Sequence, residues 1–140
     1  MATGDNPCIP LFEPGERPTG AATAAIGGGK FLKVSADMQA SPILNVTNPL
    51  VGGNVMQVAQ TVAGDRAIGV ATWDAAAAGD IVGIIGPNLV VPMVAGAAVT
   101  FGQEVQSDAA GLPIPLAAGK SNGIALNSAS GGAIVWVWLR

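Results

Sequence analysis

The chain has 140 residues, of which 50% are hydrophobic and only 11% are charged, and its formal net charge is −3. This length is enough for one domain with a sizeable core, because a domain of about 150 residues buries roughly 68–70% of its unfolded surface. The low charge and the scattered basic residues argue against nucleic acid as a partner, and they suggest that part of the surface is covered in an assembly.

Residues 1–20 are predicted to form an extended arm, followed by a single β-rich domain over residues 21–140. Prolines prevent a helix or a central strand from persisting in the arm: Pro7, Pro10, Pro14 and Pro18. Between them lie the apolar residues Cys8, Ile9, Leu11 and Phe12. Either these residues fold back onto their own domain, or they lie along a neighbouring subunit or a supporting surface. Cys8 is the single cysteine, which excludes an internal disulfide.

Residues 21–26 and 30–35 are predicted to be strands on either side of a glycine turn. The turn ends in Lys30, but Phe31 follows where a phosphate-binding loop needs a hydroxyl residue, so a nucleotide site is not predicted. Residues 37–49 have the composition of a loop. Residues 50–62 fit either a strand broken at its glycines or a short helix that begins at Asn54 and ends at Val62.

From residue 65 onward, short apolar runs alternate with turn residues. Strands are predicted over residues 67–72, 80–85, 89–94, 98–101, 104–107, 124–127 and 133–139. Residues 75–78 fit a helical turn as an alternative. The uncharged stretch 81–102 contains glycine and proline turns, which argues against a membrane span. The fold class predicted is all-β, a small sandwich or barrel of short antiparallel strands.

One phrase occurs twice in the second half of the chain. Gly69-Val70-Ala71 leads through a small-residue turn to Ile81-Val82, and Gly123-Ile124-Ala125 leads through a similar turn to Ile134-Val135. Each copy predicts a strand, a tight turn and a second strand. The duplication therefore predicts a repeated structural unit, and no catalytic group recurs with it.

The last predicted strand is apolar on both faces. Ile134, Trp136 and Trp138 alternate with Val135, Val137 and Leu139. Because both faces are apolar, both are expected to be covered, one by the core of the domain and the other by a second sheet or a second subunit. Ile134, Trp136 and Trp138 are therefore predicted to take part in subunit packing or in the core.

The chain offers few groups for catalysis. It contains no histidine and no tyrosine, which excludes a Ser-His-Asp or Cys-His arrangement. Most of its acidic residues lie beside glycine or alanine in predicted turns. Asp74 and Asp80 could approach each other across a hairpin, but two carboxylates are too few to specify a calcium site. No catalytic, cofactor-binding or metal-binding residue is predicted, and the protein is not expected to be an enzyme or to need a cofactor.

Two groups of phrases carry a resemblance: residues 8–16 (CIPLFEPGE), 22–26 (ATAAI) and 29–31 (GKF), and residues 69–71 (GVA), 74–76 (DAA), 91–96 (VPMVAG), 108–111 (DAAG) and 123–126 (GIAL). The first group resembles the opening of small head-decoration proteins of tailed phages that infect actinobacteria. The second group is similar to the wider capsid cement family. The resemblance covers most of the chain and is weakest over residues 37–62. The aromatic ending with Trp136 and Trp138 departs from it.

The resemblance implies a virion structural protein, made in the cytoplasm of a bacterial host. Such a protein binds the outer surface of the assembled capsid as a homotrimer and bridges major capsid proteins. Its partners would be the major capsid protein and itself, with no nucleic acid and no membrane. The expected contacts with the shell or a sister subunit are Cys8, Ile9, Leu11, Phe12, Ile134, Trp136 and Trp138. The alternatives are a fibre or tail module, and a carbohydrate-binding module that uses Trp73 or Trp136 as a stacking platform.

Overall fold

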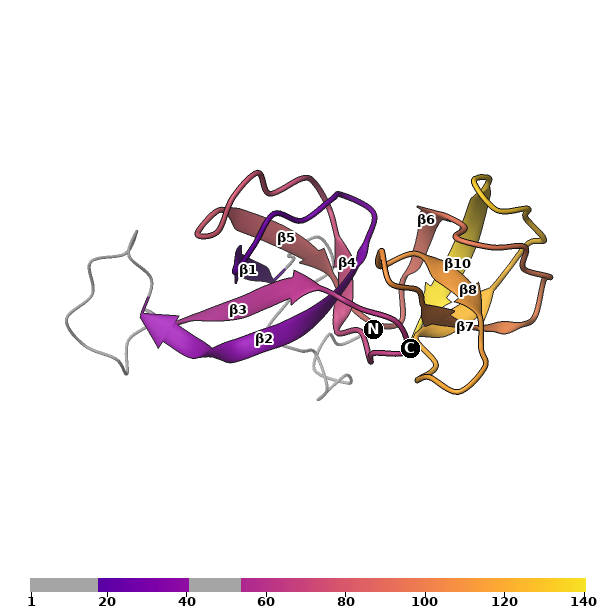
Figure 1. Ribbon diagram of the computed structural model, residues 1–140, viewed down its shortest axis with the longest axis horizontal. Coiled ribbons are helices and arrows are strands. Elements are labelled where there is room, and N and C mark those ends of the chain that lie inside the picture. The colour runs from indigo at the N-terminus through magenta and orange to yellow at the C-terminus, as the bar shows by residue number, and fades with distance from the viewer. Residues whose placement is uncertain (1–17, 41–53) are drawn as a thin grey trace, which may run out of the picture.

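The computed structural model describes residues 18–40 and 54–140, and within them the protein is all-β, as predicted (Figure 1). The described part contains ten strands: β1 (Thr19–Ala22), β2 (Phe31–Ala40), β3 (Asn54–Gln60), β4 (Gly69–Ala71), β5 (Ile81–Ile85), β6 (Val90–Val94), β7 (Glu104–Ser107), β8 (Pro113–Pro115), β9 (Gly123–Ala125) and β10 (Ile134–Leu139). No helix in these residues has the length and apolar character needed to cross a bilayer. The uncharged stretch 81–102 instead contains β5 and β6.

The strands form two sheets that lie side by side (Figure 1). The first is a closed barrel with the order β1-β3-β2-β4-β5, and the second is an open five-stranded sheet with the order β6-β10-β9-β7-β8. All pairs are antiparallel except β1 with β3, which run parallel. The prediction of antiparallel strands is therefore wrong for that one pair.

The two sheets repeat each other strand for strand. Reading around the barrel from β1 gives β1-β5-β4-β2-β3, and the second sheet reads β6-β10-β9-β7-β8. The register is also repeated: Thr19 pairs with Gly83 as Pro92 pairs with Trp136. We call residues 19–85 the first repeat and residues 90–139 the second repeat.

The turns follow the same repetition. The isolated bridge between Ile26 and Ala75 corresponds to the one between Val99 and Ala129. The N–H of Gly29 donates to the carbonyl of Ala71 at 2.8 Å, and the N–H of Gly102 donates to the carbonyl of Ala125 at 2.7 Å. The predicted duplicated hairpins are thus confirmed, and the duplication extends well beyond them.

The repeats differ in whether the sheet closes. In the first repeat β3 has seven residues and pairs with both β2 and β1, which closes the barrel. Its counterpart β8 has only three residues and pairs with β7 alone among the described strands. The second sheet therefore keeps two edges, and its inner face needs another cover.

That cover is the outer surface of the barrel. The first repeat has its own core inside the barrel, with Leu32, Val58 and Ile84 among its buried residues. Phe31 and Val70 point the other way and join the core cluster of the second repeat. Phe31 is fully buried there. The first repeat is thus complete in itself, whereas the core of the second includes side chains from the first.

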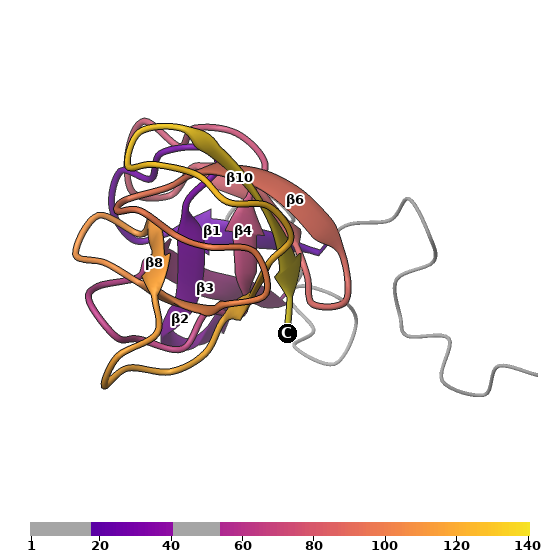
Figure 2. The same ribbon diagram turned by 90° about the vertical axis from the view of Figure 1, so that its right-hand side faces the viewer.

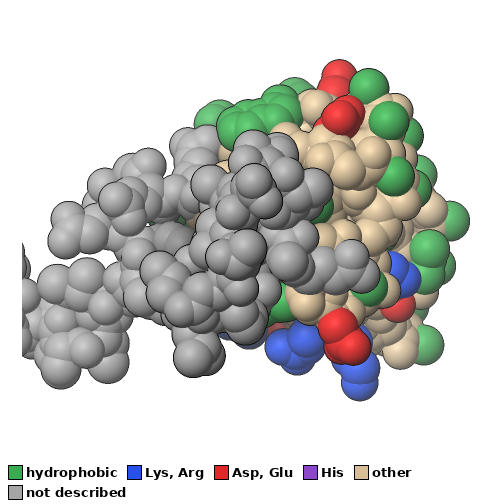
Figure 3. All heavy atoms as spheres, turned by 90° about the vertical axis from the view of Figure 1, so that its left-hand side faces the viewer, with side chains coloured by type: hydrophobic (Ala, Val, Ile, Leu, Met, Phe, Trp, Pro, Cys, Tyr) green, Lys and Arg blue, Asp and Glu red, His purple; other side chains and the backbone are tan. Residues whose placement is uncertain are grey.

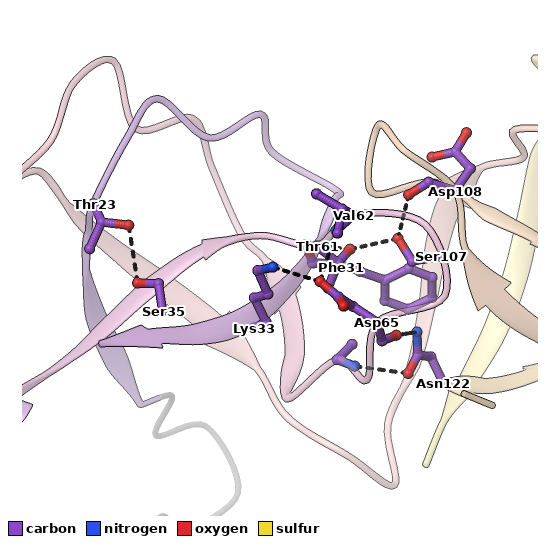
Figure 4. Close-up of polar contacts among 11 residues, drawn as sticks. Thr23, Phe31, Lys33, Ser35, Thr61, Val62, Asp65, Ser107, Asp108 and Asn122 are labelled. Carbon is purple, nitrogen blue, oxygen red and sulfur yellow. Dashed lines mark hydrogen bonds and ion pairs between the residues drawn. The ribbon is translucent and has the colours of Figure 1, made fainter. Parts of the chain in front are cut away.

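Polar contacts also fasten the loop after β3 to the second repeat (Figure 4). The hydroxyls of Thr61 and Ser107 are 2.6 Å apart and buried. The buried Asn122 side chain accepts a hydrogen bond from the N–H of Ala67 at 2.8 Å and donates one to the carbonyl of Asp65 at 3.0 Å. Buried polar groups without partners are costly, and in the described residues every buried side-chain polar atom has a partner.

Four local predictions are corrected by the structure. Residues 37–40 belong to β2 and not to a loop, and residues 54–60 form β3, so the helix alternative is wrong. Residues 98–101 contribute only the bridge at Val99, and residues 75–78 form no helical turn because Ala75 bridges to Ile26. The strand β8 was not predicted, since two of its three residues are proline.

An ion pair on the barrel gives a pH-dependent prediction. The Lys33 ammonium lies 2.6 Å from the Asp65 carboxylate (Figure 4). The hydrogen bond that Lys33 donates to this carboxylate is the main cause that holds the pKa of Asp65 below its ordinary 3.8. The hydrogen bond from the Val62 N–H is the second cause. The folded state thus binds fewer protons than the unfolded state, and the resulting stability is present above pH ~4 and lost as the pH falls through the lowered pKa.

We expect Asp65→Asn to lower the free energy of unfolding by at most about 1 kcal/mol at pH 7, because the pair is partly exposed. The difference from wild type should shrink as the pH falls below ~4. Urea unfolding at a series of pH values measures it, with the exposed Asp37→Asn as the control. A difference that stayed constant down to the lowest pH would contradict this assignment.

Candidate functional site: an exposed tryptophan face

The two sides of β10 have different environments, and the expected covering of both sides is found within the described chain for one side only. Val135, Val137 and Leu139 are buried in the core of the second repeat. Trp136 and Trp138 point outward and remain 46% and 48% exposed. Ile134 is also half-exposed. These three residues are therefore outside the core of the described chain, and their role in subunit packing stays a prediction.

Strand β6 lies beside β10 (Figure 2), and its outward side chains extend this apolar surface. Val94 pairs with Ile134, Pro92 with Trp136, and Val90 with Trp138, so their side chains share one face. All three β6 residues are exposed. We call this surface the tryptophan face, made by Val90, Pro92, Val94, Ile134, Trp136 and Trp138. Sequence reasoning missed the β6 residues, because residues 90–94 are a continuous apolar run that gives no sign of which side chains share the exposed face.

The strand that carries the tryptophans is held on both sides. It pairs with β6 along five of its residues and with β9 along three. Beyond the end of β9, the Asn127 side chain forms hydrogen bonds with the backbone of β10 in place of a strand. Its Oδ1 accepts from the N–H of Trp136 at 2.7 Å, and its Nδ2 donates to the carbonyl of Ile134 at 3.3 Å. The tryptophan face is therefore a pre-formed surface on a regular sheet.

The border of the face is polar on one side. Glu104 pairs with Ile124, the β9 neighbour of Trp138, and its carboxylate lies 3.2 Å from the guanidinium of Arg140. Both side chains of this ion pair are well exposed. An apolar centre with a polar border is the arrangement of protein–protein interfaces.

Both edges of the second sheet carry proline. Pro92 lies in the edge strand β6, and Pro113 and Pro115 lie in the opposite edge strand β8. Proline has no N–H to donate, so it blocks the addition of a further strand. Any partner of the second sheet is thus expected to meet its face and not its edges.

The other groups singled out in the sequence serve the fold. The N–H of Gly28 donates to the Asp74 carboxylate at 2.6 Å, so the glycine turn is already occupied by an anionic side chain. The Asp80 carboxylate accepts from the N–H groups of Ala76 and Ala77 in its own turn. In the described residues no three metal-ligating side chains lie together.

Figure 3 views the molecule from the side of the barrel, and its few charged side chains lie there in small groups among apolar and neutral ones.

A shallow hollow between the repeats is lined by Ala63, Gly64, Gln106, Ala118 and Gly119, without an ionisable side chain. Cys8, Ile9, Leu11 and Phe12 lie outside the described residues. The chemistry available on the tryptophan face is apolar contact.

No protein-family model matches the sequence, and no curated protein is similar to it in sequence. The fold does have a relative among solved structures, the N base of the head fiber gp8.5 in bacteriophage phi29. The two structures agree with a TM-score of 0.65 over 87% of this chain and 91% of that one, at 16% sequence identity. At this identity the likeness shows a shared fold.

Proposed function

We propose that this protein is a structural part of a phage virion that binds the outer surface of the assembled capsid and bridges major capsid proteins. The observation that carries the proposal is the fold shared with the base of a phage head fibre over 87% of the chain. The sequence phrases that resemble phage decoration proteins point in the same direction. A role without catalysis is part of the proposal, since the sequence has no histidine to act as a general base.

The proposed mechanism is the addition of several weak contacts. A copy that touches two or more capsid subunits at once gains avidity without a strong single contact. Because it binds the assembled shell and not free subunits, it shifts the assembly equilibrium toward the shell by mass action. The low charge of the chain suits such a role, because most contacts would then be apolar and insensitive to salt.

A second candidate is the base of a head fibre, which the same structural relative favours. The two roles differ in copy number. Decoration predicts hundreds of copies per particle, whereas a fibre base predicts a number set by the fibres. Quantitative gel analysis of purified particles separates the two.

We predict that the full chain sediments with empty undecorated shells and that a variant without residues 1–15 does not. The apolar residues Cys8, Ile9, Leu11 and Phe12 would be lost with this segment. The matched control is the full chain with Phe101→Ala, a substitution at an exposed turn residue. Equal occupancy by the shortened variant would remove the arm from the mechanism, and no binding by the full chain would refute the proposed function.

A further inference from the structure

The tryptophan face has a counterpart in the first repeat, and there it is covered in part. Trp138 corresponds to Ile85, which packs against the core of the second repeat. Trp136 corresponds to Gly83. A Cβ on Gly83 would lie 2.8 Å from Cη2 of Trp73, so the ring of Trp73 lies across this position. The outer face of the first repeat is therefore covered at these two positions by other parts of the chain, although the Trp73 ring itself remains 51% exposed.

The second repeat lacks the covering ring. Asn127 stands where the first repeat has Trp73, as the aligned hairpins show. The hydrogen bond is kept: Nε1 of Trp73 donates to the carbonyl of Ile81 at 3.1 Å, and Nδ2 of Asn127 donates to the carbonyl of Ile134 at 3.3 Å. The Asn127 amide supports the strand without covering it. The residue beside it is Trp136, where the first repeat has Gly83. This difference leaves an apolar face open.

The open surface is large enough for an interface. Two half-exposed tryptophans and four aliphatic residues leave roughly 600 Å² of apolar surface in water, at the upper end for the largest patch of a monomer. Two such faces packed together would bury about 1,200 Å², where stable specific interfaces begin. Sheets pack face to face in this way in β-sandwiches.

We propose that the tryptophan face is an interface between copies of this chain. Two observations select a second copy as the occupant. On the corresponding face of the first repeat, Val70 and Ile85 pack against the second repeat, which has the same fold, and the area of the tryptophan face matches what self-association needs. The proline-bearing edges leave the face as the route of contact. The inference specifies the surface for the self-association implied by the sequence resemblance, and it does not depend on capsid binding.

Sedimentation velocity over concentrations of about 1–100 μM tests the interface on the full chain. We expect wild type to form a dimer or trimer and Trp136→Glu to dissociate it, with an association constant at least about 30-fold weaker. Phe101→Glu is the matched control, because it puts the same charge on an exposed aromatic residue of the same repeat and should keep the wild-type assembly. Circular dichroism checks that each variant is folded, and Val94→Glu on β6 serves as a second variant of the face.

Fluorescence gives a readout that needs no charged substitution. Trp73→Phe leaves Trp136 and Trp138 as the emitting residues of the chain. Dilution through the dissociation range should then shift the emission to longer wavelength, because both rings pass from an apolar interface into water. An emission maximum independent of concentration in an assembled sample would place the contact elsewhere.

The outcomes separate this inference from the proposed function. A wild-type monomer at every concentration, or an assembly unchanged by Trp136→Glu, overturns the inference. A variant without residues 1–15 that is monomeric, beside an assembled Trp136→Glu, overturns it in favour of the arm. A monomer whose Trp136→Glu variant loses capsid binding overturns it too, and assigns the face to the shell. An assembly dissociated by Trp136→Glu that ignores shells supports the inference and refutes the proposed function.

Discussion

Phe31→Ala should lower the free energy of unfolding by about 3–5 kcal/mol, the largest loss expected from any single substitution considered. The Phe31 ring is fully buried, and it lies in the core cluster of the second repeat although β2 belongs to the first. The substitution leaves a cavity between the repeats, which a backbone fixed on both sides cannot fill. The Phe31 N–H donates to the carbonyl of Gly111, and the Phe31 carbonyl accepts from the N–H of Thr61.

Chemical denaturation followed by far-ultraviolet circular dichroism measures this loss. Phe101→Ala is the control, because Phe101 is 70% exposed and its truncation should change the stability by no more than about 0.5 kcal/mol. A Phe31→Ala protein as stable as the control would mean that the barrel does not supply the core of the second sheet.

Gly123→Ala should destabilise the protein by about 3 kcal/mol, and Gly69→Ala by a similar amount. A Cβ on Gly123 would lie 2.5 Å from the carbonyl oxygen of Trp138 on β10, and one on Gly69 would press against the carbonyl oxygen of Ile85 on β5. Each obstacle is backbone within a paired strand, so it cannot move aside as a flexible side chain could. The two glycines open the duplicated phrase because both repeats need the same close approach.

Gly86→Ala is the matched control for these two variants. Nothing lies within 4 Å of a Cβ on Gly86, and its backbone is outside the conformations that side chains avoid. We expect this variant to be neutral or slightly stabilising, since alanine lowers the conformational entropy of the unfolded chain. Thermal unfolding of the three alanine variants distinguishes the outcomes. Equal stability of Gly123→Ala and Gly86→Ala would show that the sheet relaxes around the added methyl group.

The duplicated phrase made the last hairpin of each repeat predictable, but the sequence did not show that the whole repeats correspond. The close approach of a neighbouring strand's backbone leaves no room for a Cβ at Gly69 and Gly123, so both copies keep glycine. Side-chain packing differs between the copies. Phe31 is buried between the repeats, and its counterpart Glu104 lies in the polar border of the second sheet. Equivalent positions of the two repeats that face different surroundings carry different residues. The two halves of the sequence therefore look unrelated outside the duplicated phrase.

The candidate site was predictable in part. Alternation along residues 133–139 predicted which side chains of β10 share a face, because the period of a strand is two. It could not decide which face the chain itself covers, since valine and tryptophan are both apolar. Packing of the barrel decides this: Phe31 and Val70 bury the side with Val135 and Val137. Trp136 therefore faces water because Phe31, about a hundred residues earlier in the chain, packs against the opposite side of its strand.

The shared core also sets an order of assembly during protein synthesis. The barrel core draws only on residues of the first repeat, which leave the ribosome before the second repeat is made. The second core is completed by Phe31 and Val70, so we expect its strands to pack onto a barrel that has already formed. We therefore expect damage to the barrel to impair the folding of the second repeat more than damage to the second repeat impairs the barrel.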